Sequence, residues 1–275
     1  MRQMVLIAGK EWLDGWRNRW VLVVTLLLAL FALTLSFLGA APTGSVKASP
    51  LAVMIVSLSS LSIFLLPLIA LLLSYDAIVG EWERGTLALL LAYPVARWQV
   101  VLGKFSGQVG ILAMATGLGY STAAVAAIMN SADFAADWSE FAAMLASSVL
   151  LGAVFIALGH IVSAVSRDRG TAGGIAIGIW LVFVLVYDMA LLGVLVADRG
   201  RVLSEEAVGW LLLINPADIY RLFNLAGTTS ASAFSGMSGL AAQAHFGPAF
   251  LISMLLLWCA VPLVAAVWVF SRRQI

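Results

Sequence analysis

The sequence predicts an all-α integral membrane protein with six transmembrane helices. Two features of its composition lead to this class: 63% of the 275 residues are hydrophobic, and only 11% are charged. A soluble domain of this length needs many more charged side chains on its surface. The third feature is the arrangement of the hydrophobic residues, which form six stretches long enough to cross a bilayer.

The six stretches belong to one membrane domain, residues 1–275. The spans are expected at about 20–41, 51–73, 105–129, 141–166, 171–197 and 248–270. The first stretch is longer than the core of a cleaved signal peptide, and a charged segment precedes it, so we expect it to remain as a span.

The basic residues indicate the orientation of the spans. Six spans place both ends of the chain on one side, and 11 of the 15 Lys and Arg residues fall in the segments on that side. These are Arg2, Lys10, Arg17, Arg19, Arg84, Arg97, Lys104, Arg167, Arg169, Arg272 and Arg273. Because short cytoplasmic loops are rich in Lys and Arg, both termini are predicted to be cytoplasmic.

Residues 1–19 have the periodicity of an amphipathic helix. Trp12, Trp16 and Trp20 recur every four residues, while charged side chains occupy the other side. Tryptophan prefers the headgroup region, so this pattern favours a helix lying in the inner membrane interface. The alternative is that these residues are the polar start of the first span.

A long segment on the outer side, residues 198–247, separates the last two spans. Helix starts are indicated at Ser204, which two glutamates follow, and at Asn215–Pro216. The second half of this segment is small, polar and uncharged, which is typical of loops or short helices.

The sequence contains neither a nucleotide site nor a convincing catalytic set. A phosphate-binding P-loop requires Gly-Lys followed by Ser or Thr, whereas Lys10 precedes Glu11 and Lys104 precedes Phe105. His160 and Ser163 share a helix face, but no third residue is placed to orient the imidazole. We therefore expect no enzyme activity, no cofactor and no metal in this chain.

Two ionisable residues in the spans are candidates for an intramembrane polar site. His160 is either a ligand or a packing residue with its ring hydrogen-bonded. Asp188 lies near the predicted outer end of the fifth span, which favours an interfacial acid over a proton carrier. The nine methionines are scattered and Cys259 is the only cysteine, so ordinary packing explains them better than a copper path.

Small residues recur at the start of the fifth span. Gly170, Gly174 and Gly178 form a small-xxx-small row, and Gly103 and Gly107 repeat the spacing once. Rows of this kind let helix backbones approach closely, so they predict helix packing.

Residues 74–104, between the second and third spans, combine charge with an apolar run that is too short to cross a membrane. Glu81 and Glu83 precede the run, as suits a helix N-terminus, and Pro94 ends it. About three turns of apolar helix are therefore expected on the cytoplasmic side. This helix is either an interfacial tether or a docking element for another protein.

The pattern E-x-E-x-G-T-L-x-x-L-L-x-Y-P-V-x-R, which begins at Glu81, resembles the signature of ABC-2-type transporter permeases. The resemblance extends over the whole chain. It is strongest to the branch of the family that serves the maturation of nitrous oxide reductase, on the stretches "SLSSLSIFLLPLIALLLSYDAIVGE" and "LLLINPADIYRLFNLAG".

The resemblance implies a permease in the bacterial inner membrane, with a second copy of the chain, a cytosolic ATPase dimer that holds ATP and Mg, and a periplasmic accessory protein. It assigns the cytoplasmic coupling helix to Glu81, Glu83, Gly85, Thr86, Leu90, Tyr93, Pro94 and Arg97. It assigns the contact with the periplasmic partner to Asn215, Pro216, Asp218, Tyr220 and Arg221. Asp218 and Arg221, three residues apart, also suit a local helix ion pair.

On this reading the transporter supplies a sulfur species or copper for the copper–sulfide centres of nitrous oxide reductase. The residues do not decide between these two substrates, nor do they give the direction of transport. The alternatives are a generic ABC-2 exporter of a drug, lipid or glycan, and a membrane scaffold that anchors a periplasmic assembly factor. Nucleic acid is not an expected partner.

Overall fold

The computed structural model describes residues 2–17, 19–39, 50–130, 138–198, 204–226 and 246–273, and within these ranges the regular structure is entirely helical. The helices are α1 (Arg2–Arg17), α2 (Arg19–Gly39), α3 (Pro50–Ser74), α4 (Val79–Glu83), α5 (Thr86–Leu91), α6 (Arg97–Asn130), α7 (Trp138–Val165), α8 (Arg169–Leu181), the π-helix η2 (Val182–Val186), α9 (Tyr187–Asp198), α10 (Glu205–Leu212), α11 (Pro216–Ala226) and α13 (Pro248–Arg272).

Five helical segments in the described part of the chain are long and apolar enough to cross a membrane, so the protein is a multi-pass membrane protein. They are Ile55–Glu83, Arg97–Val125, Trp138–Val165, Arg169–Asp198 and Pro248–Arg272. The expected first span corresponds to α2, within which Thr25–Thr34 forms a shorter apolar helix. That the first stretch, 20–41, also crosses the membrane stays a prediction, and so does the side on which the termini lie.

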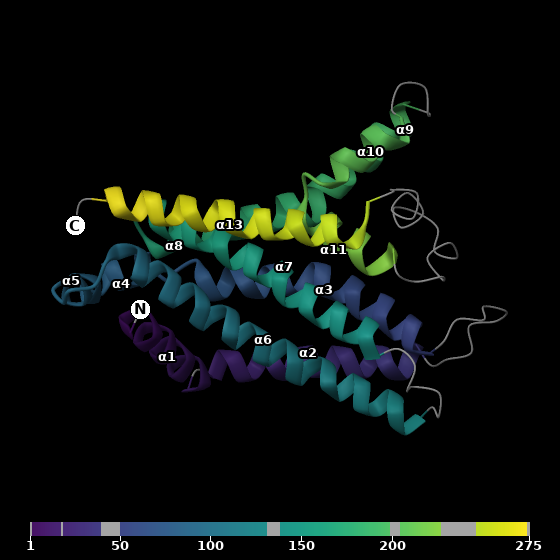
Figure 1. The fold of residues 1–275 in the computed structure, drawn as a ribbon, viewed down its shortest axis with the longest axis horizontal. Coiled ribbons are helices and arrows are strands. Elements are labelled where there is room, and N and C mark those ends of the chain that lie inside the picture. The colour runs from purple at the N-terminus through teal and green to yellow at the C-terminus, as the bar shows by residue number, and fades with distance from the viewer. Residues whose placement is uncertain are drawn as a thin grey trace.

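The long helices run side by side as an elongated bundle (Figure 1). The short helices α4 and α5 lie at the same end of the bundle as the N- and C-termini, and α11 lies toward the other end. We call these the inner and outer ends, after the predicted topology.

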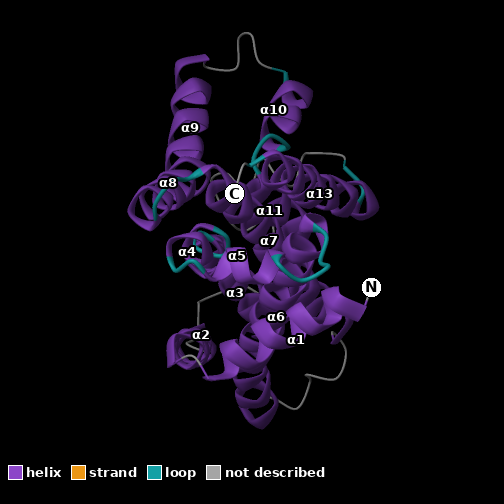
Figure 2. Ribbon diagram, turned by 90° about the vertical axis from the view of Figure 1, so that its left-hand side faces the viewer, coloured by secondary structure: helices purple, strands orange, loops and turns teal. Residues whose placement is uncertain are grey.

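Helix α7 occupies the middle of the bundle. It packs against α3, α6, α11 and α13, and Figure 2, which looks along the bundle from the inner end, shows it surrounded by other helices. Leu151, Val154 and Phe155 are fully buried on it. A helix that is apolar on every side belongs in the interior of a bundle, which explains why α7 carries almost no amphipathic pattern.

Helix α1 packs across α6 at glycines of α6. A side-chain carbon at Gly103 or Gly107 would meet the α1 backbone near Met4 and Ala8. The small-xxx-small spacing of Gly103 and Gly107 therefore corresponds to close packing between α1 and α6. Val5, Leu6 and Leu13 are exposed. The side chains of Trp16 and Trp20 lie outside the described residues, and the interfacial position of α1 stays a prediction.

Two expectations about helix boundaries differ from the structure. Helix α6 begins at Arg97, well before the expected start of the third span at 105. The expected start was set by hydropathy, whereas the helix also includes the polar residues that precede the apolar stretch. The first turn is capped by Gln99, whose side-chain oxygen accepts from the Ala96 N–H at 3.0 Å. The expected helix of three turns is divided into α4, which holds Glu81 and Glu83, and α5, which holds the apolar run. Gly85, with φ of 71°, separates them in a left-handed conformation that glycine adopts readily.

Candidate functional site

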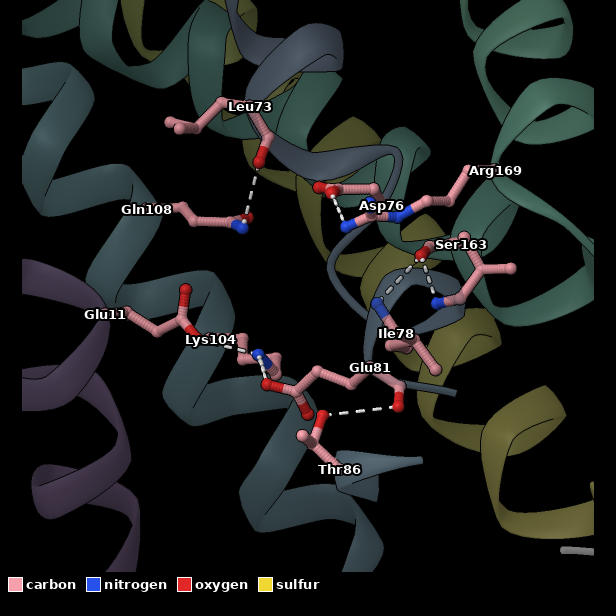
Figure 3. Close-up of polar contacts among 11 residues, drawn as sticks. Glu11, Leu73, Asp76, Ile78, Glu81, Thr86, Lys104, Gln108, Ser163 and Arg169 are labelled. Atoms are coloured by element: carbon pink, nitrogen blue, oxygen red, sulfur yellow. Dashed lines mark hydrogen bonds and ion pairs between the residues drawn. The ribbon is translucent and has the colours of Figure 1, made fainter. Parts of the chain in front are cut away.

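The connection between α3 and α6, residues 75–96, is the candidate site, and we call it the inner-loop segment. It contains α4 and α5, and its charged and backbone groups bond to α1, α6, α7 and α8 (Figure 3). These bonds connect residues that are far apart in the sequence.

Lys104 of α6 is the centre of a buried ion-pair triad. Its ammonium nitrogen lies 2.6 Å from Glu11 Oε1 of α1 and 2.7 Å from Glu81 Oε1 of α4 (Figure 3). Only 3% of Lys104 is exposed to solvent, and Glu81 is also buried. One lysine therefore holds α1 and α4 against α6. In a low-dielectric interior such a group requires its partners, because an unpaired buried charge is costly.

A second ion-pair group joins the inner-loop segment to the start of α8. Arg169 Nη2 lies 2.9 Å from Asp76 Oδ2 (Figure 3). The Arg169 backbone N–H donates to Glu83 Oε1 at 2.9 Å. The first amides of a helix have no partner within it, so Glu83 satisfies one of them at the positive end of α8. These side chains are partly exposed, and we expect a smaller contribution to stability than from the Lys104 triad.

Ser163 of α7 holds the backbone at the start of α4. Its hydroxyl oxygen accepts from the N–H groups of Ile78 and Val79 at 2.8 and 3.0 Å. Ser163 is thus a structural acceptor here. His160, one turn earlier, is fully buried, and its Nδ1 lies 2.9 Å from the Ile156 carbonyl oxygen. One ring nitrogen is therefore hydrogen-bonded, whereas the buried Nε2 has no hydrogen-bond partner among the described residues, and the role of His160 stays open.

The predicted coupling residues divide into an inward and an outward set. Glu81 is buried, Leu90 is half-buried, and the Arg97 guanidinium bonds to carbonyls at the end of α13. The outward set includes Tyr93, which is 70% exposed, beside Leu89, which is 69% exposed.

The turn residues of the segment lie at its surface. Glu83, Gly85, Thr86 and Pro94 are exposed. The Thr86 hydroxyl donates to the Glu81 carbonyl oxygen at 3.3 Å, and the Pro94 carbonyl accepts from Gln3 at 2.6 Å. The segment therefore presents apolar and turn residues outward, while its charged groups fasten it to the bundle.

A second polar cluster lies at the outer end, and it joins residues from two separate predictions. Arg221 Nη2 lies 2.8 Å from Asp188 Oδ2 of α9, and Arg221 also pairs with Asp218. Asn215 donates to Asp218 Oδ2 at 3.0 Å and to the Phe183 carbonyl oxygen at 2.8 Å. Phe183 belongs to the π-helix η2, whose irregular turn accommodates this extra hydrogen bond.

The predicted residues of the outer segment mostly face the interior. Asn215, Pro216, Asp218 and Tyr220 are buried, and the Tyr220 hydroxyl lies 2.8 Å from Ser148 Oγ of α7. Arg221 is the member of this set that is partly exposed. The first four residues therefore hold α11 in place. The local pair of Asp218 and Arg221 is present, as its spacing suggested, and Asp188 extends it.

Burial in this cluster raises the pKa of Asp218 to about 7 from 3.8. Loss of hydration is the largest cause, the charge of Arg221 opposes it, and the carboxylate of Asp188 adds to it. Between pH 4 and 7 the folded chain keeps a proton that the unfolded chain has lost. The stabilisation is complete below about pH 4 and is lost as the pH rises through about 7.

We expect the protein to be less stable at pH 8 than at pH 6. For a single group with a folded-state pKa near 7, the free energy of unfolding falls by about 1 kcal/mol over this interval. Unfolding in detergent at the two pH values measures it, with Asp218→Asn as the control. This variant keeps the side-chain shape and should lose that part of the pH dependence; an unchanged pH dependence would contradict the assignment to Asp218.

The small-residue row of α8 differs from that of α6. A side-chain carbon built at Gly174 or Gly178 has no neighbouring atom within 4 Å, and at Gly170 it meets only Asp168 of the same turn. Within one chain the row is therefore open, and its predicted role in helix packing stays a prediction.

No group of three or more His, Cys, Asp or Glu side chains suited to a metal ion occurs in the described part of the chain. Sequence reasoning missed Lys104 and Arg169 as residues that fasten the inner-loop segment. A signal for Lys104 was present: a lysine at an interior position of an apolar helix requires a carboxylate partner, and two glutamates lie in the neighbouring segments.

The whole chain matches a known family. The model for "ABC-2 family transporter protein" matches residues 5–275. The chain is 44% identical over 275 residues to the probable ABC transporter permease protein NosY of Stutzerimonas stutzeri, and the match covers 99% of each chain. It is 45% identical over 271 residues to the protein of that name in Pseudomonas aeruginosa, over 98% of each chain.

A more distant similarity extends outside this group. The uncharacterized transmembrane protein YxlG of Bacillus subtilis is 26% identical over 196 residues, which are 65% of this chain and 74% of that protein.

Proposed function

The chain belongs to the ABC-2 transporter family, and we propose that it is the permease subunit through which a cytosolic ATPase drives transport for the maturation of nitrous oxide reductase. That it is a permease of an ABC transporter follows from the family and from the two NosY permeases. The substrate, the copy number and the periplasmic partner are parts of the proposal.

The observation that carries the proposal is the construction of the inner-loop segment. Leu89 and Tyr93 are exposed on it, although apolar surface of this kind outside a membrane is normally covered by a partner. The same segment is fastened through Lys104 to α1 and α6, and through Arg169 to α8. A partner that pushed on its outward face would move several helices together.

In the proposed mechanism, ATP binding closes two partner ATPases, and each ATPase presses on the inner-loop segment of one copy of this chain. The ion pairs of Lys104 and Arg169 resist separation of the segment from the bundle, so displacement passes to the long helices. The spans then reorient between inward- and outward-facing states. Catalysis of ATP hydrolysis belongs to the partner, with its own ATP and Mg.

The proposed cargo is a sulfur species, with copper as the alternative, for the copper–sulfide centres of nitrous oxide reductase. The similarity to the two NosY permeases supports the link to nitrous oxide reductase, and the cargo is inferred from the chemistry of that enzyme's centres. The outer segment, built around the cluster of Asp188, Asp218 and Arg221, would meet the periplasmic accessory protein. The complex would lie in the inner membrane with two copies of this chain. Uptake of labelled sulfide and of copper into vesicles with the complete complex distinguishes the two cargoes.

We expect the double substitution Glu83→Ala and Thr86→Ala to uncouple ATP hydrolysis from transport. Glu83 holds the start of α8, and Thr86 holds the turn before α5. The loss of these bonds should lower transport per ATP hydrolysed by about tenfold, since 1.4 kcal/mol corresponds to that factor. The measurement is made in vesicles containing the permease, its ATPase and the accessory protein.

The matched control is Lys10→Ala, an exposed substitution in α1 at the same end of the bundle. It should leave the coupling ratio unchanged. Full coupling in the Glu83 and Thr86 variant would contradict the role of the inner-loop segment. If copper–sulfide centres still assemble in cells whose partner ATPase is inactive, the chain is a scaffold and not a transporter.

A further inference from the structure

We propose that Arg97 and Arg273 form a clamp that fastens the end of α13 to the inner-loop segment, so that α13 transmits the motion of that segment to the outer end. We call this pair the C-terminal clamp. The inference rests on the proposed function, because it assigns a second route by which the partner ATPase would move the membrane helices.

Arg273 connects three elements at the inner end. Its two terminal nitrogens donate to the carbonyl oxygens of Ala164 and Ser166 at 3.0 and 2.9 Å. Ala164 lies in the last turn of α7 and Ser166 directly follows the last residue of that helix, so neither carbonyl has an intrahelical amide available. On its other side the guanidinium lies 5.1 Å from the centroid of the Trp82 ring of α4. Arg273 thus lies between α7 and the inner-loop segment, and it extends directly from α13.

Arg97 makes the reciprocal connection from the first residue of α6. Its Nη1 lies within hydrogen-bonding distance of the carbonyl oxygens of Phe270, Ser271 and Arg273, at 3.0, 2.8 and 2.7 Å. A cation at this position satisfies the free carbonyls at the end of α13 and favours the negative end of its dipole. Arg97 therefore connects the end of α13 to α6, and Arg273 connects the same end to α7 and α4.

An apolar contact beneath the clamp makes the connection stiff. Leu87 of α5, Val100 of α6, Ala164 of α7 and Phe270 of α13 belong to one buried cluster. Packed side chains transmit displacement because interiors have little free volume. The hydrogen bonds of the clamp also resist separation of the helices. Displacement of α4 away from α13 would therefore be transmitted as well as displacement of α5 toward it.

Near its middle α13 contacts the outer segment. The Trp258 indole N–H donates to the Leu213 carbonyl oxygen at 3.2 Å, and its ring packs edge-on against Phe183 of η2. Phe183 also receives the hydrogen bond of Asn215. One continuous helix therefore connects the inner-loop segment with the polar cluster of Asp188, Asp218 and Arg221.

The neighbouring residue, Arg272, supplies a matched control. It is exposed, and its guanidinium lies 4.1 Å from the centroid of Trp268, a residue of the same helix. It has the same charge and almost the same position in the chain as Arg273, but it joins no second element through that contact. Arg272→Ala and Arg273→Ala therefore differ in the clamp and share the loss of one positive charge.

The test measures two distances with spin labels in the complete complex with its ATPase, in a Cys259→Ser background. The inner pair is placed at Arg84→Cys and Val264→Cys, and the outer pair at Ile214→Cys and Ser253→Cys, all exposed positions. In the chain with native arginines and in Arg272→Ala, we expect a narrow inner distance and an ATP-dependent change of the outer distance. In Arg273→Ala, we expect a broadened inner distance, and an ATP-dependent outer population reduced about tenfold at unchanged ATP binding.

Further variants separate the clamp from a general loss of folding. Arg273→Lys keeps the charge but cannot donate to two carbonyls in a fork, so it should give an intermediate result, as should Trp82→Leu. Both outer and inner readouts equal to those of Arg272→Ala would overturn the clamp. If the native chain shows no ATP-dependent outer change, the proposed function fails, while the inner distance still tests the clamp alone.

Discussion

Lys104→Met is expected to destabilise the folded protein by about 3–5 kcal/mol, the range found when one partner of a buried ion pair is removed. The methionine fills most of the space of the lysine, so the effect comes from charge and not from a cavity. Glu11 and Glu81 would be left close to each other beside α6 with no cation between them. The free energy of unfolding, measured by denaturant titration in mixed micelles, gives the size of the effect.

The removal of a carboxylate should cost less than the removal of the lysine. In Glu81→Gln the lysine retains Glu11, and in Glu11→Gln it retains Glu81, so each variant keeps one complete pair. The triple variant Lys104→Met, Glu11→Gln and Glu81→Gln removes every charge and should recover most of the lost stability. A triple variant as unstable as Lys104→Met alone would show that the charges are not the cause.

The membrane class and most long helices follow from the sequence because they depend on local properties. Apolar length, the proline at the start of α13 and the proline after α5 are read within one window of sequence. Helix α13, Pro248–Arg272, lies close to its expected bounds of 248–270 for this reason. The division at Gly85 was not expected, because a glycine between a charged stretch and an apolar run is compatible with either a helix or a turn.

The bonds that make up the candidate site were not predictable in the same way. Glu11 and Lys104 are separated by 93 positions, and so are Asp76 and Arg169. A single sequence shows which residues carry charge, but the choice of partner depends on how the helices pack. Asp188 was considered as an isolated acid for the same reason, although it shares Arg221 with Asp218.

The two glycine rows also show that a sequence pattern does not identify the packing partner. Both follow the same small-xxx-small spacing, yet α1 covers the row of α6, while the row of α8 is open within one chain. Spacing predicts that a helix can be approached closely, and it does not say by what. The two rows therefore provide a matched pair of substitutions, and the second row tests whether another copy of the chain covers it.

Gly107→Val is expected to detach α1 from α6, whereas Gly178→Val should leave the isolated chain unaffected. A side-chain carbon at Gly107 would lie 2.6 Å from Glu11 Cβ and 3.0 Å from the Ala8 carbonyl oxygen. Part of α1 must move to make room, which costs about 1–3 kcal/mol by overpacking. The movement would also withdraw Glu11 from Lys104. Proteolysis of α1 and the free energy of unfolding measure these effects.

The effect of intrinsic helix propensity is the same in Gly107→Val and Gly178→Val, because both replace glycine with valine inside a helix. A difference between the two variants therefore reports on packing. At Gly178 no atom lies within 4 Å, so the stability of a single chain should not fall. If a second copy packs on the row of α8, Gly178→Val should instead lower the fraction of dimer in detergent, while Gly107→Val leaves that fraction much less affected. An unchanged dimer fraction in Gly178→Val would exclude this row from the contact between copies, and equal stability of Gly107→Val and the native chain would exclude the close packing of α1 on α6.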